Sequence, residues 1–188
     1  MLKRAFDIWL SCVGLIISFP VWILSSIAII MESGGPVFIR QERGGKDREL
    51  FLILKFRSMD KEAHKESPVE HAGEREKRIT LVGKILRATA MDELPQLLSI
   101  FKGDMSFVGP RPIHPKEPAI TGSKHDRLED VPDFNKRCAI KPGLTGIAQV
   151  YAVRELAIEK KVKYDILYIK KQSFLLDLKL ILLSFLVT

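Results

Sequence analysis

The sequence predicts an α+β protein with a membrane-anchoring segment over residues 1–34 and one compact, mostly helical unit over residues 35–188. Three observations predict this class. The N-terminal segment is almost entirely apolar, residues 36–58 contain two β-rich runs around a pair of glycines, and residues 81–101 show helical spacing. The chain has 188 residues, which is enough for one domain with a real hydrophobic core.

Charge divides the chain in two. The four charged residues among the first 33 cancel, so the whole net charge of +7 lies in the remainder. An apolar head on a basic body favours a partner that is an anionic membrane, a phosphate compound or a nucleic acid. Nucleic acid is the weakest of these, because only 8% of residues are aromatic and no recognition motif is present. Cys12 and Cys138 form no disulfide or zinc framework.

The membrane segment is the clearest feature of the N-terminal part. From Ile8 to Met31 there are 24 consecutive uncharged residues. As a helix they extend roughly 36 Å, more than the roughly 30 Å of a hydrocarbon core. A secretory signal is disfavoured, because the run is too long and no small-residue cleavage site follows. Pro20, just after Ser18, predicts a kink. Basic flanks on both sides leave a bent span and a re-entrant helix equally open.

Three segments of the remaining chain are expected to be a hairpin, a surface excursion and an irregular connection. Residues 36–58 place β-rich runs on either side of Gly44-Gly45, which favours a hairpin. Residues 60–78 hold 11 charges in 19 positions and no apolar face, so we expect a solvated excursion. Residues 113–135, rich in proline, are expected to form an irregular connection.

Two helices are predicted between these segments. Leu81–Ala90 predicts a short one. A second helical face follows from apolar residues spaced i, i+3, i+4 and i+7, namely Leu94, Leu97, Leu98 and Phe101. Gly103 is a natural stop, Asp92 is an N-cap candidate, and Pro95 falls in the tolerated first turn.

The C-terminal third predicts a strand and a helix. Residues 141–150 (KPGLTGIAQV) favour a turn followed by a short strand. The apolar stretch from Phe174 to Thr188 is too short to span a membrane, so we expect a buried or interfacial helix.

Adjacent carboxylates at Asp92 and Glu93 are the strongest candidates for chemistry. The positive end of a helix dipole favours an ionised carboxylate and also attracts phosphate. Such a carboxylate can attack phosphorus as a covalent nucleophile while its neighbour holds a divalent cation on the phosphate oxygens. Taken alone, the two residues are more often an ordinary helix cap.

Cations near this pair in the sequence strengthen the catalytic interpretation. Arg87 precedes the pair, and Arg111 stands between Pro110 and Pro112, whose fixed φ angles limit the backbone. Guanidinium groups match phosphate oxygens. Lys55 and Arg57, at the end of the second β-rich run, are candidates for the same site. The chain has no Gly-rich nucleotide loop, zinc-protease motif or hydrolase nucleophile elbow.

Six segments then carry a family resemblance. They are KRAFD (3–7), PVFIRQERGG (36–45), KFRSM (55–59), DELPQLLSIFKGDMSFVGPRP (92–112), KPGLTGIAQV (141–150) and DILYIKKQSFLLDLKL (165–180). In this order they resemble the bacterial sugar transferases, the small monotopic phosphoglycosyl transferases that begin glycan assembly on a lipid carrier. The similarity covers nearly the whole chain, and the block at 92–112 is very specific.

The resemblance implies a fold and a location. The family is anchored by a re-entrant helix-break-helix at a Ser-Pro-type site, here Ser18 and Pro20 with one extra residue between them. Its compact α+β catalytic domain lies with interfacial helices on the cytoplasmic face of the bacterial inner membrane. The implied partners are a UDP-sugar donor, undecaprenyl phosphate as acceptor and inner-membrane phospholipid, with no nucleic acid and with a homodimer left open.

The resemblance also implies roles for individual residues. Asp92 is the nucleophile that attacks the β-phosphorus of the UDP-sugar, UMP leaves, and undecaprenyl phosphate then takes the phosphosugar from Asp92. Glu93 is the second catalytic residue and the ligand of Mg²⁺. Substrate binding is assigned to Lys55, Arg87, Arg111 and Asp165, and a structural role at the site to Pro110 and Pro112.

One departure and one rival limit this interpretation. Tyr151-Ala152-Val153 stands where many relatives have Asn-Gly-Arg, so the donor sugar is not carried over from them. The rival is a non-catalytic, membrane-anchored basic module that binds anionic lipid or partner proteins. Such a module tolerates Asp92→Asn, whereas an enzyme of the implied type does not.

Overall fold

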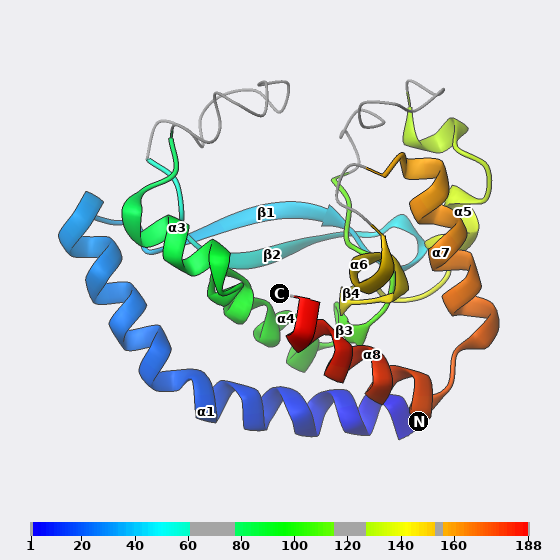
Figure 1. The fold of residues 1–188 in the computed structure, drawn as a ribbon, viewed down its shortest axis with the longest axis horizontal. Coiled ribbons are helices and arrows are strands. Elements are labelled where there is room, and N and C mark those ends of the chain that lie inside the picture. Colours follow the sequence, from blue (N-terminus) through cyan, green and yellow to red (C-terminus); the bar gives the residue numbers. More distant parts are fainter. Residues whose placement is uncertain (1, 61–77, 115–126, 153–155, 188) are drawn as a thin grey trace.

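A computed structural model of the protein describes residues 2–60, 78–114, 127–152 and 156–187. Most of the charged excursion expected at 60–78 lies outside the described residues, and so do the middle of the connection at 113–135 and Val153. The four described parts form a mixed α/β structure with one long N-terminal helix, consistent with the predicted α+β class (Figure 1).

Helix α1 (Leu2–Ser33) has 32 residues and contains Pro20. The helix is continuous through Ser18 and Pro20, so the expected break is not a non-helical interruption. Figure 1 shows α1 running beneath the rest of the chain and then turning upward toward α3. Proline removes one helical hydrogen bond and commonly causes such a bend. The Ser18 hydroxyl is buried and accepts a hydrogen bond from Trp22 Nε1 at 3.1 Å.

The two ends of α1 are held by the same folded unit. At its start, Arg4 donates to the carbonyl oxygens of Ile100 and Phe101 at 2.6 and 2.7 Å. At its end, Glu32 accepts hydrogen bonds from the backbone N–H groups of Leu81 and Val82. Both ends of the apolar helix therefore lie against elements that follow it in the chain.

The predicted hairpin is confirmed. Strand β1 (Phe38–Gly44) pairs antiparallel with β2 (Leu50–Phe56), with Phe38 opposite Phe56. The connection is longer than a Gly44-Gly45 turn, because the 3₁₀ turn η1 (Lys46–Arg48) extends it. Aromatic rings from α1 and the hairpin meet at one end, where the Trp22 and Phe56 centroids are 5.7 Å apart. Helix α1 and the hairpin thus share a core.

The short helix predicted from Leu81 is confirmed, while the second helix begins differently from the prediction. Helix α3 (Leu81–Ala88) has Thr80 as its N-cap, whose side chain accepts from the N–H of Gly83. A 3₁₀ helix, η3 (Met91–Gln96), then leads into α4 (Leu97–Lys102). Asp92 is therefore inside η3, and the N-cap position belongs to Ala90, at a φ of 52° and with no side-chain cap hydrogen bond. The Asp92 N-cap prediction is wrong, while Gly103 ends α4 as expected, at a φ of 104°.

The described part of the C-terminal half adds a second small sheet and five more helical segments. Strand β3 (Ser106–Val108) pairs in parallel with β4 (Gly143–Thr145), so the predicted strand in 141–150 is short. Residues after it form helix α6 (Ile147–Tyr151) instead. The remaining elements are η4 (Leu128–Asp130), α5 (Phe134–Arg137), α7 (Ile158–Lys171) and α8 (Phe174–Val187).

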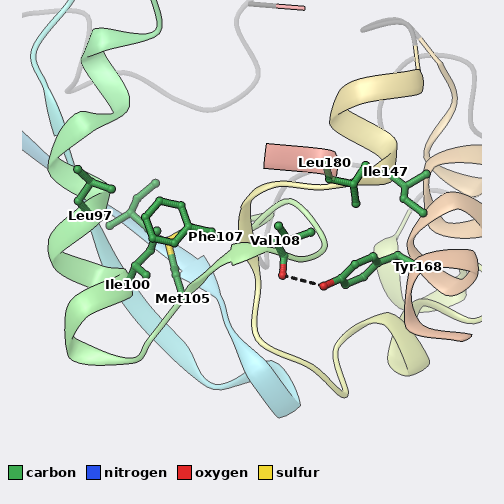
Figure 2. Close-up of a cluster of buried hydrophobic side chains, with 9 residues drawn as sticks. Leu97, Ile100, Met105, Phe107, Val108, Ile147, Tyr168 and Leu180 are labelled. Atoms are coloured by element: carbon green, nitrogen blue, oxygen red, sulfur yellow. Dashed lines mark hydrogen bonds between the residues drawn. The ribbon is translucent and has the colours of Figure 1, made fainter. Parts of the chain in front are cut away.

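The main hydrophobic core lies where the two sheets meet α4, α7 and α8. Figure 2 shows these side chains converging from elements far apart in the sequence. Its buried members are Ile53, Leu97, Ile100, Met105, Phe107, Val108, Ile147, Tyr168 and Leu180. The core holds β3, and with it the loop that follows β3, in a fixed place relative to η3 and β2.

Large apolar side chains remain exposed on several helices. The most apolar 18-residue window of α1 is only 17% buried, so this helix is not the core helix of a globular domain. Exposed members on α1, α3 and α8 include Ile16, Ile17, Met31, Leu81, Ile85, Leu182, Phe185 and Leu186. Water-exposed patches of this kind mark membrane or protein contacts. The exposed apolar surface of α1 indicates membrane association, and α8 fits the expected interfacial helix.

Candidate active site

The site is built where η3 lies against the end of β2. Lys55 is the next-to-last residue of β2, and its ammonium group lies 2.6 Å from Oε1 of Glu93 in η3. Arg111, after β3, brings a guanidinium nitrogen to 3.7 Å from the same carboxylate oxygen. Residues 38 and 18 positions away from Glu93 thus converge on it, as the resemblance implied.

Glu93 is held as an anion by these neighbours. Burial of its carboxyl opposes ionisation, but the charges of Lys55 and then of Arg111 outweigh burial, and the pKa of Glu93 is lowered. Hydrogen bonds from Lys55 and Gln96 act in the same direction. A carboxylate with several donors around it keeps a fixed orientation.

Asp92 is a half-buried carboxylate whose pKa shifts in the opposite direction from that of Glu93. Burial raises its pKa, and the charge of Glu93 adds to this rise, while Lys55 and Arg87 lower it without cancelling the effect. The described residues form no ion pair with Asp92 within 4.0 Å. Burial makes the ionised Asp92 less well solvated than an ordinary aspartate, which suits a nucleophile.

Arg87 and Arg111 flank the pair from two other elements. Arg87 comes from the last turn of α3, is exposed, and donates from Nε to the hydroxyl oxygen of Ser58 at 2.8 Å. Arg111 has a side chain that is 61% exposed, between the buried Pro110 and the half-buried Pro112. Both guanidinium groups therefore keep donors available to an incoming anion.

Asp165 lies behind this site rather than in it. It is 3% exposed and pairs with the Nε of Arg137 at 2.8 Å. Arg137 in turn donates to the backbone carbonyl oxygen of Arg111 at 2.8 Å. Burial raises the pKa of Asp165, although Arg137 opposes the rise. The geometry makes Asp165 a support for the Arg111 backbone and leaves no direct contact with Asp92 or Glu93.

Two outcomes differ from the expectations about cations. Arg57 does not join the site, because its guanidinium is buried under the end of α1, where it donates to Ser33 and to the carbonyl of Gly34. Arg137 was not singled out from the sequence, where it is one basic residue of an irregular connection. Its burial is created by α7 and the Arg111 loop, which are distant in the sequence.

The donor set at this site fits Mg²⁺ bound together with a phosphate substrate. The described residues contain no cluster of three or more His, Cys, Asp and Glu side chains able to hold a metal. Asp92 and Glu93 supply carboxylate oxygens, and Mg²⁺ commonly uses one or two carboxylates, water and substrate phosphates. One oxygen of Glu93 already contacts Lys55, so the carboxylates alone are a weak site until a phosphate adds its oxygens.

The exposed apolar side chains of α1 indicate a membrane-associated protein. The carboxylate pair Asp92–Glu93, with cationic side chains beside it, indicates a site for phosphate chemistry. Comparison with known proteins makes the class specific. The family model described as bacterial sugar transferase matches residues 1–188. The chain therefore belongs to the bacterial sugar transferase family and is a transferase.

Several characterised relatives are similar over almost the whole of this chain. The exopolysaccharide production protein PSS of Rhizobium leguminosarum bv. phaseoli is 36% identical, across 96% of this chain and 92% of the relative. A UDP-glucose:undecaprenyl-phosphate glucose-1-phosphate transferase of Caulobacter vibrioides is 39% identical, across 96% and 67%. A UDP-N-acetylgalactosamine-undecaprenyl-phosphate N-acetylgalactosaminephosphotransferase of Aeromonas hydrophila is 35% identical, across 96% of this chain but 42% of that longer relative.

Proposed function

We propose that this protein is a phosphoglycosyl transferase that moves a sugar-1-phosphate from a UDP-sugar to undecaprenyl phosphate and releases UMP. Relatives that differ in their named sugar share this reaction type. The observation that carries the proposal is the cluster in which Lys55 and Arg111 both face Glu93 beside Asp92. Both substrates are anions, and a cationic cluster offsets their repulsion and the charge that develops in phosphoryl transfer.

The first step uses Asp92 as the nucleophile. One of its carboxylate oxygens forms a bond to the β-phosphorus of the UDP-sugar. The bond from that phosphorus to the bridging oxygen breaks, and UMP departs with the electron pair. The product is an acyl phosphate between Asp92 and the sugar phosphate. We assign Arg87 and Arg111 to the phosphate oxygens during this step, an assignment supported by the exposure of both guanidinium groups.

The second step returns Asp92 to its starting state. A phosphate oxygen of undecaprenyl phosphate forms a bond to the phosphorus of the acyl phosphate, and Asp92 leaves as a free carboxylate. The product is undecaprenyl diphosphate-sugar. Because UMP leaves before the acceptor reacts, donor and acceptor use one site in turn, which is a ping-pong scheme.

Glu93, with Asp92 beside it, is the residue that would hold Mg²⁺. When bound, Mg²⁺ supplies charge stabilisation to the diphosphate oxygens. Lys55 fixes the orientation of Glu93 through the 2.6 Å contact and keeps it ionised. The carboxylate is therefore ready to bind a cation without first losing a proton.

We further propose that α1 is re-entrant and that both of its ends lie on the cytoplasmic side of the inner membrane. In support, Arg4 at its start and Glu32 at its end bind elements of one folded unit. If α1 spanned the membrane, its two ends would lie on opposite sides. The folded unit that binds both ends would then have to cross the hydrocarbon core with its charged residues. A bend at Pro20 removes this conflict. The acceptor lipid then meets the site near the headgroup plane.

Cysteine labelling tests the topology. Cys12 and Cys138 are replaced by alanine, and single cysteines are introduced at Lys3 or at Lys46. Intact cells are exposed to a membrane-impermeant maleimide, and permeabilised cells serve as the positive control. The re-entrant arrangement predicts labelling of both sites only after permeabilisation. Labelling of either site in intact cells contradicts it.

Release of UMP tests the reaction. Purified protein in nanodiscs is mixed with Mg²⁺, undecaprenyl phosphate and each of several UDP-sugars, including UDP-glucose and UDP-N-acetylgalactosamine. We expect UMP from one or two donors, with loss of release in Asp92→Asn and with a chelator. Folded protein that is silent with every donor, or equal release by Asp92→Asn, contradicts the proposal and favours a membrane-anchored binding module.

A further inference from the structure

We propose that Lys3 and Asp7 of the membrane helix, together with Tyr168 and Asp177, are positioning residues for the loop that carries Arg111. This inference rests on the proposed function, because it assigns Arg111 to substrate phosphate. It gives the KRAFD segment at 3–7 a role beyond anchoring. The four side chains come from α1, α7 and α8, and all of them act on the short strand β3 or on one another.

Asp7 binds the first half of β3. Its side chain is 4% exposed, and one carboxylate oxygen accepts hydrogen bonds from the hydroxyl of Ser106 at 3.2 Å and the backbone N–H of Phe107 at 3.1 Å. Among the described residues, strand β3 pairs only with β4, so its other edge offers backbone groups that need partners. A carboxylate from the membrane helix supplies a partner there.

Lys3 and Tyr168 bind the second half of β3 at a single atom. The carbonyl oxygen of Val108 accepts from the ammonium of Lys3 at 3.1 Å and from the hydroxyl of Tyr168 at 3.2 Å. Figure 2 shows the Tyr168 hydroxyl pointing at this carbonyl. Asp177 joins the two donors. One of its carboxylate oxygens lies 2.6 Å from the Lys3 ammonium, and the other lies 2.6 Å from the Tyr168 hydroxyl, whose single proton it shares with the Val108 carbonyl.

We call the contacts of Lys3, Asp7, Tyr168 and Asp177 with β3 the junction at β3. Burial of these contacts fixes the geometry of the junction. Asp177 and Tyr168 are 3% and 1% exposed. Burial, followed by the hydrogen bond and charge of Asp177, raises the pKa of Tyr168, so its hydroxyl keeps its proton and stays a donor. Each group lost from such a network leaves a buried partner unsatisfied, which is costly.

The backbone between Val108 and Arg111 is fixed, so the position of Val108 determines the position of Arg111. Gly109 donates to the carbonyl of Thr145 at 2.9 Å, and the carbonyl of Pro110 accepts from Gly143 at 2.9 Å. A Cβ at Gly109 would lie 2.5 Å from the carbonyl oxygen of Lys141, so this chain segment is packed against its neighbour without space. Prolines on both sides of Arg111 restrict the remaining rotation. A shift of Val108 therefore displaces Arg111.

Amide hydrogen exchange in the substrate-free protein tests the structural half of the proposal. In Tyr168→Phe, which keeps the ring and removes only the hydroxyl, we expect the Gly109 amide to exchange about five to ten times faster, the change that loss of one buried hydrogen bond produces. Asp7→Ala gives the same result, and Asp7→Asn, which keeps an acceptor oxygen, restores slow exchange. This readout needs no substrate.

Arg4→Met is the matched control. Arg4 lies beside Lys3 and also joins α1 to the domain, but it binds the carbonyls of Ile100 and Phe101 at the end of α4. Compared with Lys3→Met, it removes the same charge from the same helix turn without touching β3. We expect faster exchange near Gly103 and unchanged exchange at Gly109. Equal effects of the two variants at Gly109 overturn the proposal, because α1 then acts only as a general anchor.

A double-mutant cycle tests the link to Arg111. With the donor found active above, Tyr168→Phe is expected to lower kcat/KM for the donor about tenfold through KM, while the same change in an Arg111→Ala background lowers it less than about twofold. Full additivity of the two changes overturns the proposed link even if the enzyme is active. If no donor is turned over but Gly109 exchange behaves as stated, the proposed function fails and the junction at β3 stands.

Discussion

Lys55 and Glu93 form a half-buried ion pair that joins the β-hairpin to the 3₁₀ turn carrying Asp92. Their charged atoms are 2.6 Å apart, and their side chains are 16% and 23% exposed. The same lysine lowers the pKa of both carboxyls of the Asp92–Glu93 pair. One cation on a strand therefore favours the ionised form of both a proposed nucleophile and a proposed metal ligand.

Lys55→Met is expected to lower the rate of UMP release roughly 10²-fold, a loss of the size seen when one preorganised charge is removed from a phosphate or oxyanion site. Glu93 then loses the donor that orients it and becomes easier to protonate. Lys84→Met, on the exposed side of α3, is the control and should keep wild-type activity. A Lys55→Met enzyme within about threefold of wild type contradicts this role.

The pH dependence of kcat/KM for the donor is expected to show an acidic limb set by Asp92. Burial places the pKa of Asp92 above its ordinary 3.8, so activity rises as pH increases through that raised value. Because Lys55 lowers this pKa, the limb should move to higher pH in Lys55→Met. A limb that moves to lower pH, or does not move, shows that another group controls it.

Asp92→Asn is expected to stabilise the protein at neutral pH while abolishing activity. A carboxyl whose pKa is raised by folding favours the folded state at low pH, and this contribution is lost as pH rises through the raised pKa. At neutral pH the buried charge is unfavourable, and a neutral amide removes it. Thermal unfolding in detergent should show a higher midpoint for Asp92→Asn than for the wild type at pH 7. This difference should disappear below the ordinary aspartate pKa of 3.8. A lower midpoint at pH 7 would falsify the assignment.

Asp165→Asn is expected to destabilise the fold, because it leaves the buried Arg137 without its charge partner. Breaking a buried pair costs about 3 kcal/mol, which corresponds to a fall in midpoint of roughly 6–12 °C for a domain of this size. Asp133→Asn is the matched control, since Asp133 forms an exposed pair with Lys136 and its loss should change the midpoint little. Similar midpoints for the two variants contradict the supporting role of Asp165.

The sequence predicted those features that local patterns determine. The β-rich runs around Gly44-Gly45 predicted β1 and β2, and the apolar spacing before Gly103 predicted a helix that ends there. It predicted the wrong start for that helix. The positive φ of Ala90 and the 3₁₀ helix η3 place Asp92 inside the first turn of η3 rather than at its N-cap, because packing of η3 against β2 overrides capping preference.

The sequence predicted only those site residues that belong to the recognised family segments. Lys55, Glu93 and Arg111 belong to recognised segments, and the structure brings them together. Arg57 belongs to the same KFRSM segment but lies one residue beyond the end of β2, so strand geometry no longer fixes its side chain on the face of Lys55. Its guanidinium donates instead to Ser33 and Gly34 at the end of α1. The parallel pair β3–β4 and the buried Arg137 depend on contacts between residues far apart in sequence, which no local pattern reveals.

The half-reaction without acceptor tests whether Asp92 forms a covalent phosphosugar intermediate. Protein in nanodiscs is mixed with Mg²⁺ and the active UDP-sugar but no undecaprenyl phosphate, and released UMP and intact protein mass are measured together. We expect up to one UMP per protein and a matching gain of one phosphosugar, both absent in Asp92→Asn and reversed by adding UMP. Release of UMP only when the acceptor is present, with no change in protein mass, contradicts a covalent intermediate on Asp92.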